Sequence, residues 1–311
     1  MRDKIYIFGF LVGAGLLLYV GRSLLEESAV VTWGLTFAGT TAAGVLGMAL
    51  YRVQLELRAS RHELALRQAE LNFALEVQRA LFPRQLPADH GLEFSGVCVP
   101  ARGISGDYYD VVPLSSGRVG FAVADISGKG ISAAILMSNL HAVLRTLVAA
   151  GCTPAEVGAR LNQHLNQVTE GLRFATFFYG EWNPTTRCLS YVNAGHNAPF
   201  LVSAHRVQRL VPCGPPLGLF PELELAVREC RLEWGDLLAL FSDGVTEAGI
   251  EQGREFGEER LEKLIAGQAG KPLAEIQQQI LTAVTRWAGQ ELEDDLTLLL
   301  VRVTEENKET P

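Results

Sequence analysis

Two long runs without a charged residue lie near the start of this chain of 311 residues, at positions 5–20 and 29–51. A membrane-spanning helix needs about 20 mainly apolar residues. The second run meets this length, and the first meets it when it is extended to residue 25, with Arg22 reaching toward the interface. The sequence therefore predicts a hairpin of two transmembrane helices, over 5–25 and 29–51, as a membrane anchor over 1–51.

The flanking charges predict how this hairpin is oriented. Arg2 and Lys4 precede the first run, arginines follow the second from position 52, and the short connection holds Glu26 and Glu27. Lys and Arg favour the cytoplasmic side, so both ends of the hairpin are expected there. A cleaved signal peptide is the weaker alternative, because no small-x-small cleavage site follows the first run. Two buried core helices would not explain the abrupt arginine flank.

Residues 52–87 are expected to be a linker, helical to about residue 81 because that stretch lacks Gly and Pro. Leucines recur at seven-residue spacing from the end of the second run into this linker, at Leu50, Leu57, Leu64 and Leu71. The half-heptad positions between them are mostly polar, so the coiled-coil pattern is weak. A parallel homodimer and an amphipathic linker helix packed on its own domain both remain open. Pro83 and Pro87 are expected to end the helix.

Composition and charge limit what residues 88–311 can be. Hydrophobic residues make up 48% of the chain, enough apolar surface to fold. Beyond residue 90 the chain carries 18 basic and 27 acidic side chains, which disfavours nucleic acid as a partner. The five cysteines are scattered without C-x-x-C spacing, so we interpret them as small buried hydrophobes rather than a zinc site or disulfide framework.

Short β-type runs alternate with helical stretches in this part of the chain. Strands are expected at 93–100, 119–125, 175–182, 189–193, 199–203, 225–231, 237–242 and 296–303. Helices are expected at 131–150, 154–170, 258–266 and 272–287. The runs 175–182 and 189–193 are joined by a turn-rich hairpin loop. Hairpins with grouped helices indicate an α+β fold of antiparallel sheets with helices on their faces.

Acidic residues gather where apolar strands begin or end. They occur in four segments: 103–110 (GISGDYYD), 123–130 (VADISGKG), 240–247 (LFSDGVTE) and 292–297 (LEDDLT). Each alone is more often a turn than a site. Four in one domain, without His or Cys beside them, favour a shared centre for hard ions such as Mg²⁺ or Mn²⁺. Two such ions would activate a water and hold a phosphate.

The same motifs carry a family resemblance over about residues 74–303. VQRALFPRQLP leads into the domain, SGDYYD and DISGKG follow, and ATFFYGEWNP, YVNAGHNAPFL, GPPLGL, FSDGVTEA and DDLTLLLVRV complete the order. In this order they resemble the SpoIIE/RsbU-type serine/threonine phosphatases of bacteria, a branch of the PPM metal-dependent phosphatases. The resemblance implies a β-sandwich of two antiparallel sheets flanked by helices (αββα) over 88–311.

The resemblance also implies which residues hold two Mn²⁺ or Mg²⁺ ions. Asp107 matches one ligand, Asp125 matches the bridging ligand with the Ile126 carbonyl nearby, and Asp243 and Asp294 match the ligands of the other ion. Asp295 is the weaker of its pair, because the family pattern allows Asn there. Asp110 fits a place behind the ligands better than a place among them. For His196 a turn-stabilising role is expected, and Lys129 would attract phosphate without belonging to a nucleotide P-loop.

The function implied is hydrolysis of phosphoserine or phosphothreonine on a partner protein by metal-activated water, without a covalent intermediate. The expected substrate is a phosphorylated STAS-domain protein such as an anti-anti-sigma factor, and the expected location is the bacterial inner membrane with the phosphatase domain in the cytoplasm. In the family the helix entering the domain controls assembly of the metal site, so residues 71–87 are a candidate switch. Two alternatives stay open: a catalytically silent signalling scaffold, and a two-metal hydrolase of another phosphoester.

Overall fold

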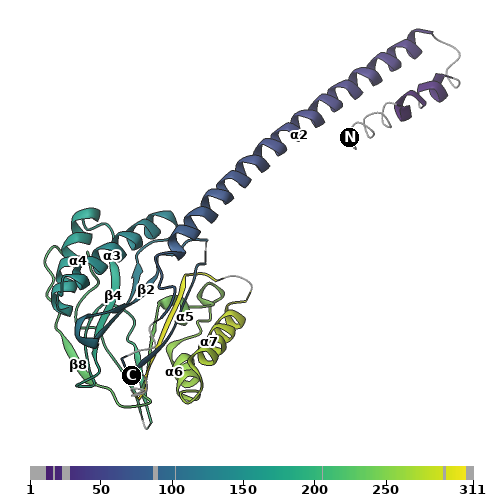
Figure 1. The fold of residues 1–311 in the computed structure, drawn as a ribbon. Coiled ribbons are helices and arrows are strands. Elements are labelled where there is room, and N and C mark those ends of the chain that lie inside the picture. Colours follow the sequence, from purple (N-terminus) through teal and green to yellow (C-terminus); the bar gives the residue numbers. More distant parts are fainter. Residues whose placement is uncertain are drawn as a thin grey trace. The chain divides into compact units, whose positions relative to one another are not determined.

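The computed structural model describes residues 12–16, 18–22, 29–86, 90–101, 103–204, 206–289 and 292–305 (Figure 1). It divides into two compact units, residues 1–70 and 71–311. One helix, α2 (Ala29–Arg79), begins in the first unit and ends in the second. Arg2, Lys4, Glu26, Glu27, Pro87 and half of the first expected span lie outside the described residues.

The described residues of the first unit are helical. Residues 12–16 and 18–22 are helical, and Leu18 lies 3.8 Å from where a Cβ on Gly39 would stand, so the two helices touch there. The apolar first half of α2 is long enough to cross a membrane, and Trp33 and Phe37 are exposed on it. Its threonine hydroxyls donate to carbonyls one turn earlier, as Thr36 does to Thr32 (2.7 Å), which suits an apolar surrounding.

The second unit is a sandwich of two five-stranded antiparallel sheets. Sheet A has the order β1 (Leu92–Val99), β10 (Leu296–Val303), β9 (Leu237–Phe241), β6 (Phe200–Ser203) and β7 (Arg206–Arg209). Sheet B has the order β2 (Tyr108–Pro113), β3 (Val119–Ile126), β4 (Ala175–Asn183), β5 (Cys188–Ala194) and β8 (Arg228–Arg231). Every pairing between neighbouring strands is antiparallel.

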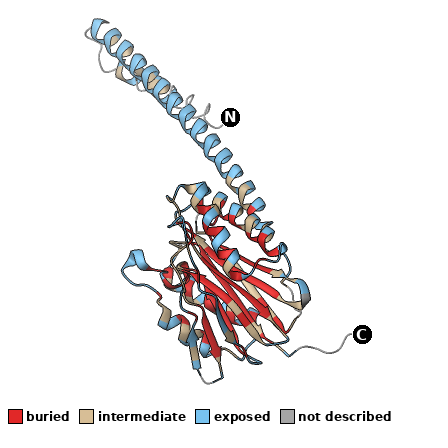
Figure 2. Ribbon diagram, turned by 90° about the vertical axis from the view of Figure 1, so that its left-hand side faces the viewer, coloured by how far each residue is buried: buried red, intermediate tan, exposed pale blue. Residues whose placement is uncertain are grey.

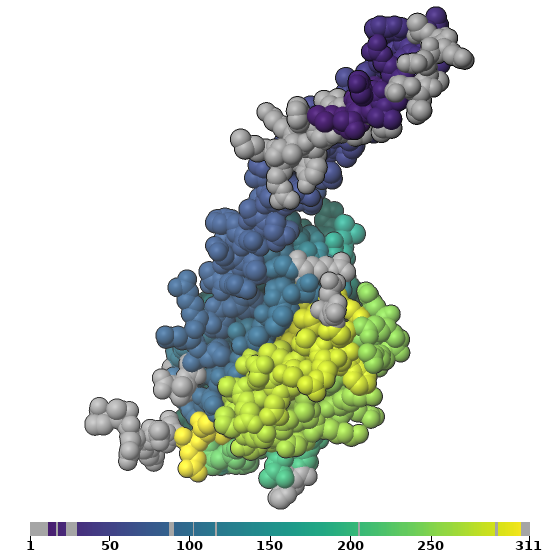
Figure 3. Space-filling view, turned by 90° about the vertical axis from the view of Figure 1, so that its right-hand side faces the viewer, coloured from purple at the N-terminus to yellow at the C-terminus, as the bar shows by residue number. Residues whose placement is uncertain are grey.

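Helices cover the outer face of each sheet (Figures 1 and 2). On sheet B lie α3 (Ile131–Ala149) and α4 (Pro154–Thr169), and on sheet A lie α6 (Glu258–Ala266) and α7 (Leu273–Ala288). Figure 3 shows the face that α6 and α7 cover, in green and yellow. A single-turn helix, α5 (Asp243–Thr246), follows β9. The expected α+β sandwich of the αββα type is confirmed.

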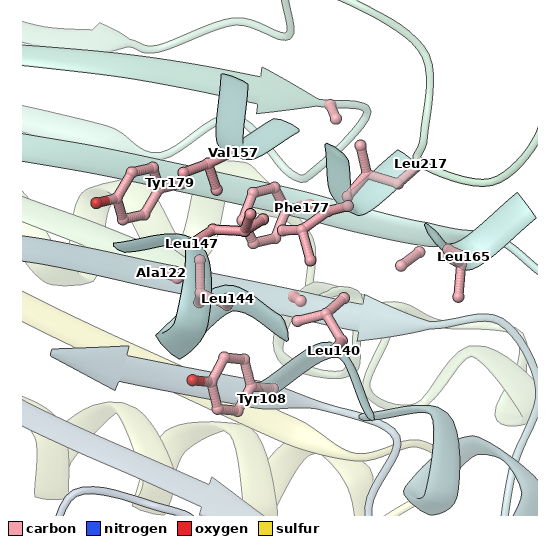
Figure 4. Close-up of a cluster of buried hydrophobic side chains, with 14 of the residues drawn as sticks. Tyr108, Ala122, Leu140, Leu144, Leu147, Val157, Leu165, Phe177, Tyr179 and Leu217 are labelled. Carbon is pink, nitrogen blue, oxygen red and sulfur yellow. The ribbon is translucent and has the colours of Figure 1, made fainter. Parts of the chain in front are cut away.

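Both faces of the central strands are apolar because both are covered. In β3, Phe121 and Val123 point between the sheets, whereas Ala122 and Ala124 point to α3 and α4. Figure 4 shows the outer cluster, where Leu140 and Leu144 of α3 meet strand side chains such as Phe177. This explains why such strands read as continuous apolar runs in the sequence.

The expected strands and helices occur within a few residues of their predicted ends, and the predicted hairpin is the β4–β5 pair. Strands β2 and β7 and helix α5 were not predicted. Strand β2 carries Asp110 and two tyrosines, and β7 is the charged edge strand RVQR, so neither shows an apolar strand pattern. The helix expected to follow the second span is continuous with it, as α2.

Candidate active site

Four strand ends bring the predicted acidic residues to one edge of the sandwich. Asp125 is the second-last residue of β3, and Asp107 directly precedes β2, whose Tyr108 pairs with Ala124. In sheet A, Asp243 follows β9 after one residue, and Asp294 comes two residues before β10. Because β9 pairs antiparallel with β10, these two carboxylates also meet at one edge.

The carboxylates oppose one another's ionisation. Burial and then the charges of Asp243 and Asp294 raise the pKa of Asp125 to about 7. Burial and then Asp125 raise the pKa of Asp107 well above its ordinary value. Burial and then Asp294 raise the pKa of Asp243. Because each of these pKa values is raised in part by a neighbouring carboxylate, the group has a strong demand for positive charge.

One oxygen of this group is buried without a partner. Among the described residues, Asp107 Oδ2 and the nearby Thr297 Oγ1 have no hydrogen-bond partner. A buried carboxylate oxygen without a donor is costly, and a cation would satisfy it. As the side chains stand, no three His, Cys, Asp or Glu residues of the described part enclose a single ion. The donors are all oxygens, the set that Mg²⁺ and Mn²⁺ prefer.

Asp295 holds the backbone beside Asp107. Its Oδ1 accepts from the N–H of Ala101 and its Oδ2 from the N–H of Gly106, both at 2.8 Å. Both oxygens are therefore engaged by the loop that leads to Asp107. Sequence reasoning ranked Asp295 below Asp294 as a ligand, and the structure gives it a separate role as a clamp on this loop.

The end of α2 holds the same loop from its other side. The amide of Gln78, which is buried, donates to the carbonyl of Ser105 (2.7 Å) and accepts from its N–H (2.9 Å). The hydroxyl of Ser105 in turn accepts from the N–H of Asp107 (2.9 Å). Sequence reasoning did not single out Gln78. Its only signal was its place in the segment VQRALFPRQLP.

Gly244 allows the two acidic segments of sheet A to meet. A Cβ at this position would stand 2.0 Å from the carbonyl oxygen of Asp295. Ser242 strengthens the same junction, since its hydroxyl donates to that oxygen (3.2 Å) and accepts from the N–H of Thr297 (3.0 Å). The Ser-Asp-Gly sequence is thus required by close backbone approach as well as by the carboxylate of Asp243.

Two positively charged side chains, those of Lys129 and Arg173, lie at the turn after β3, beside the carboxylates. Lys129 Nζ lies 2.6 Å from Asp294 Oδ2 and donates to the carbonyl of Glu293 (3.0 Å). Arg173 donates through Nη1 to the carbonyl of Ser127 (2.9 Å), and a Cβ on Gly128 would collide with its guanidinium. Nothing in the sequence singled out Arg173, because it reaches the turn from the loop after α4.

Acidic side chains surround the site on the side of α5, where Asp294, the partner of Lys129, meets Asp243. Burial, and then Asp243, Asp294 and Glu255, raise the pKa of Glu247, which follows α5. The carboxylate of Glu293 accepts from the N–H of Glu251 (3.1 Å).

Asp110 points away from the group. Its carboxylate is fully buried and binds Arg145 of α3 through two bonds of 2.6 Å, and it accepts from the hydroxyl of Tyr108 (2.5 Å). It therefore fixes α3 to β2, which agrees with a place behind the predicted ligands.

His196 is buried behind the site. Its ring Nδ1 lies 2.8 Å from Thr176 Oγ1, and its backbone N–H donates to Asn193 Oδ1 (2.8 Å). Burial lowers its pKa to about 4. Both contacts agree with the predicted turn-stabilising role.

Comparisons with known proteins identify the fold and the family. A profile of the family described as stage II sporulation protein E (SpoIIE) matches residues 115–304. Phosphoserine phosphatase RsbU of Bacillus subtilis is 32% identical over 259 residues, covering 82% of this chain and 75% of RsbU. The chain matches four other curated relatives as well, and it spans about half of their length or less.

Solved structures show the same fold at lower identity. The SiaA-PP2C domain of Pseudomonas aeruginosa superimposes with a TM-score of 0.69 at 22% identity, over 77% of this chain and 98% of that domain. RsbX in complex with magnesium matches with a TM-score of 0.55 at 19% identity, over 71% of this chain and 99% of RsbX. These structures share the fold, and the family match over residues 115–304 with the 32% identity to RsbU shows that the chain belongs to the SpoIIE family of PP2C-type serine/threonine phosphatases.

Proposed function

We propose that this chain is a membrane-anchored, metal-dependent phosphatase that hydrolyses phosphoserine or phosphothreonine on a partner protein. The observation that carries this proposal is the group of four carboxylates at one sandwich edge. Within it Asp107 Oδ2 is buried without a partner and the pKa of Asp125 is raised to about 7. Such a group is stable at neutral pH only with added positive charge. The name of RsbU as a phosphoserine phosphatase supports the substrate class.

The residues present fit two divalent cations. Asp107, Asp125, Asp243, Asp294 and the carbonyl of Ile126 would hold them, through oxygen donors that suit Mn²⁺ and Mg²⁺ alike. When bound, such ions supply a water of lowered pKa and positive charge for the phosphoryl oxygens. The magnesium in the RsbX complex supports this class of ion.

The chain's own residues hold this geometry and meet the substrate. Asp295 and Gln78 fix the loop that positions Asp107, so its carboxylate is oriented before substrate arrives. Preorganised groups of this kind lower the cost of reorganisation during the reaction. Lys129 and Arg173 place positive charge beside the carboxylates, where a phosphate dianion would approach.

We assign the anchor to residues 1–51, the linker to 52–87 and the catalytic domain to 88–311. The apolar length of α2 and the exposed aromatic side chains on it support insertion in the bacterial inner membrane. The arginines that follow residue 51 support a cytoplasmic catalytic domain. The exposed leucines 50, 57 and 64 of α2 support pairing with a second copy through the linker.

The substrate we assign is a phosphorylated STAS-domain protein of the anti-anti-sigma type, and the switch is the end of α2. The Gln78–Ser105 contact supports the switch, because a movement of α2 would act on the loop before Asp107.

The test is phosphate release by the full-length chain from a phosphoserine protein and from p-nitrophenyl phosphate, with Mn²⁺, with Mg²⁺ and with EDTA. Asp125→Asn removes one carboxylate, and Glu275→Gln on α7 is the matched control. We expect metal-dependent release that Asp125→Asn abolishes and Glu275→Gln leaves unchanged. A folded chain that binds no metal and turns over neither substrate would favour the scaffold, and turnover of other phosphoesters alone would favour the broader hydrolase.

A further inference from the structure

Exposed apolar side chains gather on one side of the catalytic edge. Eleven large apolar side chains are exposed in the described residues after Leu81, and four of them are scattered: Val211, Val227, Trp234 and Ile250. The other seven lie around the turn that follows Asp125. We define six of them as the apolar rim, with Phe174 at its inner edge: Ile131, Ile135, Val168, Leu172, Leu219 and Phe220.

The pairing of α3 with α4 aligns the helical part of this rim. Asn139 of α3 is hydrogen-bonded to His164 of α4. The two helices are antiparallel, so the residues one turn closer to the catalytic edge, Ile135 on α3 and Val168 on α4, lie level with each other. Their side chains are 63% and 52% exposed. Ile131 is the first residue of α3, and Leu172, three residues beyond the end of α4, is 82% exposed.

The loops complete the rim and join it to the site. Asn162 and Asn166 of α4 donate to the carbonyls of Phe220 and Gly218 (3.0 and 2.9 Å), which holds Leu219 and Phe220 against the end of α4. Phe174 and Ser127 are joined by two hydrogen bonds of 2.9 Å. The rim is therefore continuous with the turn that bears Lys129.

The charges on the two sides of the site differ. Between the rim and the carboxylates stand Arg173 and Lys129, whereas Glu247, Glu251 and Glu293 lie on the side of α5 and β10. A phosphorylated segment approaching over the acidic side would be repelled. The rim also bears the exposed Glu170 and Glu222, but next to the carboxylates it ends at Arg173 and Lys129, so a phosphorylated segment approaching over it meets positive charge nearest the site.

We infer that the apolar rim is the docking surface for the phosphoprotein substrate, and that it binds apolar side chains flanking the phosphorylated residue. This inference rests on the proposed function and adds the substrate determinant to it. Contiguous exposed apolar surface on a folded domain marks an interaction site. The continuity of the rim with the catalytic turn makes the substrate its occupant, since a protein with its phosphoserine at the carboxylates must also cover the neighbouring surface.

Two nine-residue peptides with a central phosphoserine test this inference, one with leucine and one with serine at the four nearest flanking positions. The full-length chain with Mn²⁺ is expected to hydrolyse the leucine-flanked peptide with at least about tenfold higher kcat/KM, the effect of about 1.4 kcal/mol. The double variant Ile135→Asp/Leu172→Asp is expected to lose this preference through KM. Its kcat/KM for p-nitrophenyl phosphate is expected to stay within about twofold of the parent chain.

A matched control lies at the far end of the same helix pair. Val227 borders a pocket with Thr153 and Pro154, where α4 begins, and is 42% exposed. Val227→Asp is expected to keep the preference. Ile135→Ser/Leu172→Ser removes the apolar surface without adding charge. Its loss of preference would show that apolar contact, and not charge repulsion, is the cause. It also replaces the Asp variant as the test if that variant does not fold.

Other results overturn the inference. One is an equal rate for the two peptides in the parent chain. Another is an equal loss of activity on both peptides and on p-nitrophenyl phosphate in both double variants. A third is a change in the sedimentation of the double variants with both activities intact, which would make the rim an interface between copies of the chain. Absence of Mn²⁺-dependent release from p-nitrophenyl phosphate by the parent chain would instead overturn the proposed function and the docking surface together.

Discussion

The side-chain amide of Gln78 makes two hydrogen bonds to the backbone of Ser105, one as donor and one as acceptor. Ser105 lies two residues before Asp107 and accepts from its N–H. The last turn of α2 is therefore joined to a proposed metal ligand through a single intermediate residue. A shift of the helix end by even one ångström would break both amide bonds, because hydrogen bonds weaken steeply with distance.

Replacing Gln78 with leucine removes both bonds while keeping a buried side chain of similar size. The loop before Asp107 would then lose one of its two supports, and buried polar groups left unpaired cost about 1–3 kcal/mol. We expect Mn²⁺-dependent phosphate release to fall by about tenfold or more, with an increase in the Mn²⁺ concentration needed for half-maximal rate.

Val77→Ala, at the exposed neighbouring position, is the control and is expected to change neither quantity. Prolines at Leu71 or Leu75 disturb the same helix without touching the loop, and they are expected to alter the rate in the full chain. Unchanged rates in Gln78→Leu and in both proline variants would show that α2 does not control the site.

Gly244→Ala tests the close approach of the two acidic segments of sheet A. Its Cβ would stand 2.0 Å from the carbonyl oxygen of Asp295, so the backbone must move. We expect a loss of about 1–3 kcal/mol in the free energy of unfolding and a strong loss of activity. Gly270→Ala is the matched control, since a Cβ there meets nothing within 4 Å. Similar urea midpoints for the two variants would contradict the proposed packing.

Arg145→Ala tests the bond between α3 and β2. It leaves the carboxylate of Asp110 buried without its cation, which typically costs about 3–5 kcal/mol. Because the Arg145 side chain is 40% exposed, we expect the lower end, about 3 kcal/mol. Asp110→Asn combined with Arg145→Ala is expected to lose less than the sum of the two single variants, as measured by urea unfolding in a double-mutant cycle. Additive losses would show that the pair does not interact.

Sequence reasoning predicted the sandwich because its central strands are apolar on both faces and its acidic motifs occur in a recognisable order. It missed β2 and β7 for a physical reason. The carboxylate of Asp110 in β2 is bound by Arg145 from a distant helix, and that partner cannot be read from the strand itself. The edge strand β7 has few apolar contacts to specify it.

In the candidate site, too, some residues could be predicted from the sequence and others are revealed by the structure alone. Asp107, Asp125, Asp243 and Asp294 stand at strand ends, a pattern that is visible in the sequence. Gln78, Arg173 and the clamp made by Asp295 act through partners 27 to 194 positions away. Their roles depend on tertiary contacts, so spacing along the chain could not reveal them.

His196 gives the chain a pH dependence of known sign. Its pKa is about 4 in the folded chain because of burial, against about 6.5 when unfolded. The unfolded chain therefore takes up the proton first, so the contribution of His196 to stability is complete above pH 6.5 and is lost as the pH falls toward 4. Because a tenfold difference in proton affinity corresponds to about 1.4 kcal/mol, this contribution is at most about 3 kcal/mol.

His196→Gln removes this titration while retaining a polar side chain for Thr176. Urea unfolding in EDTA at pH 7.5, 6 and 5 is expected to show a smaller loss of stability in the variant than in the parent chain. The carboxylates titrate in both proteins, so the difference between the two curves isolates the histidine. Parallel curves would mean that His196 binds a proton equally in the folded and unfolded states, and is therefore not buried as the structure places it.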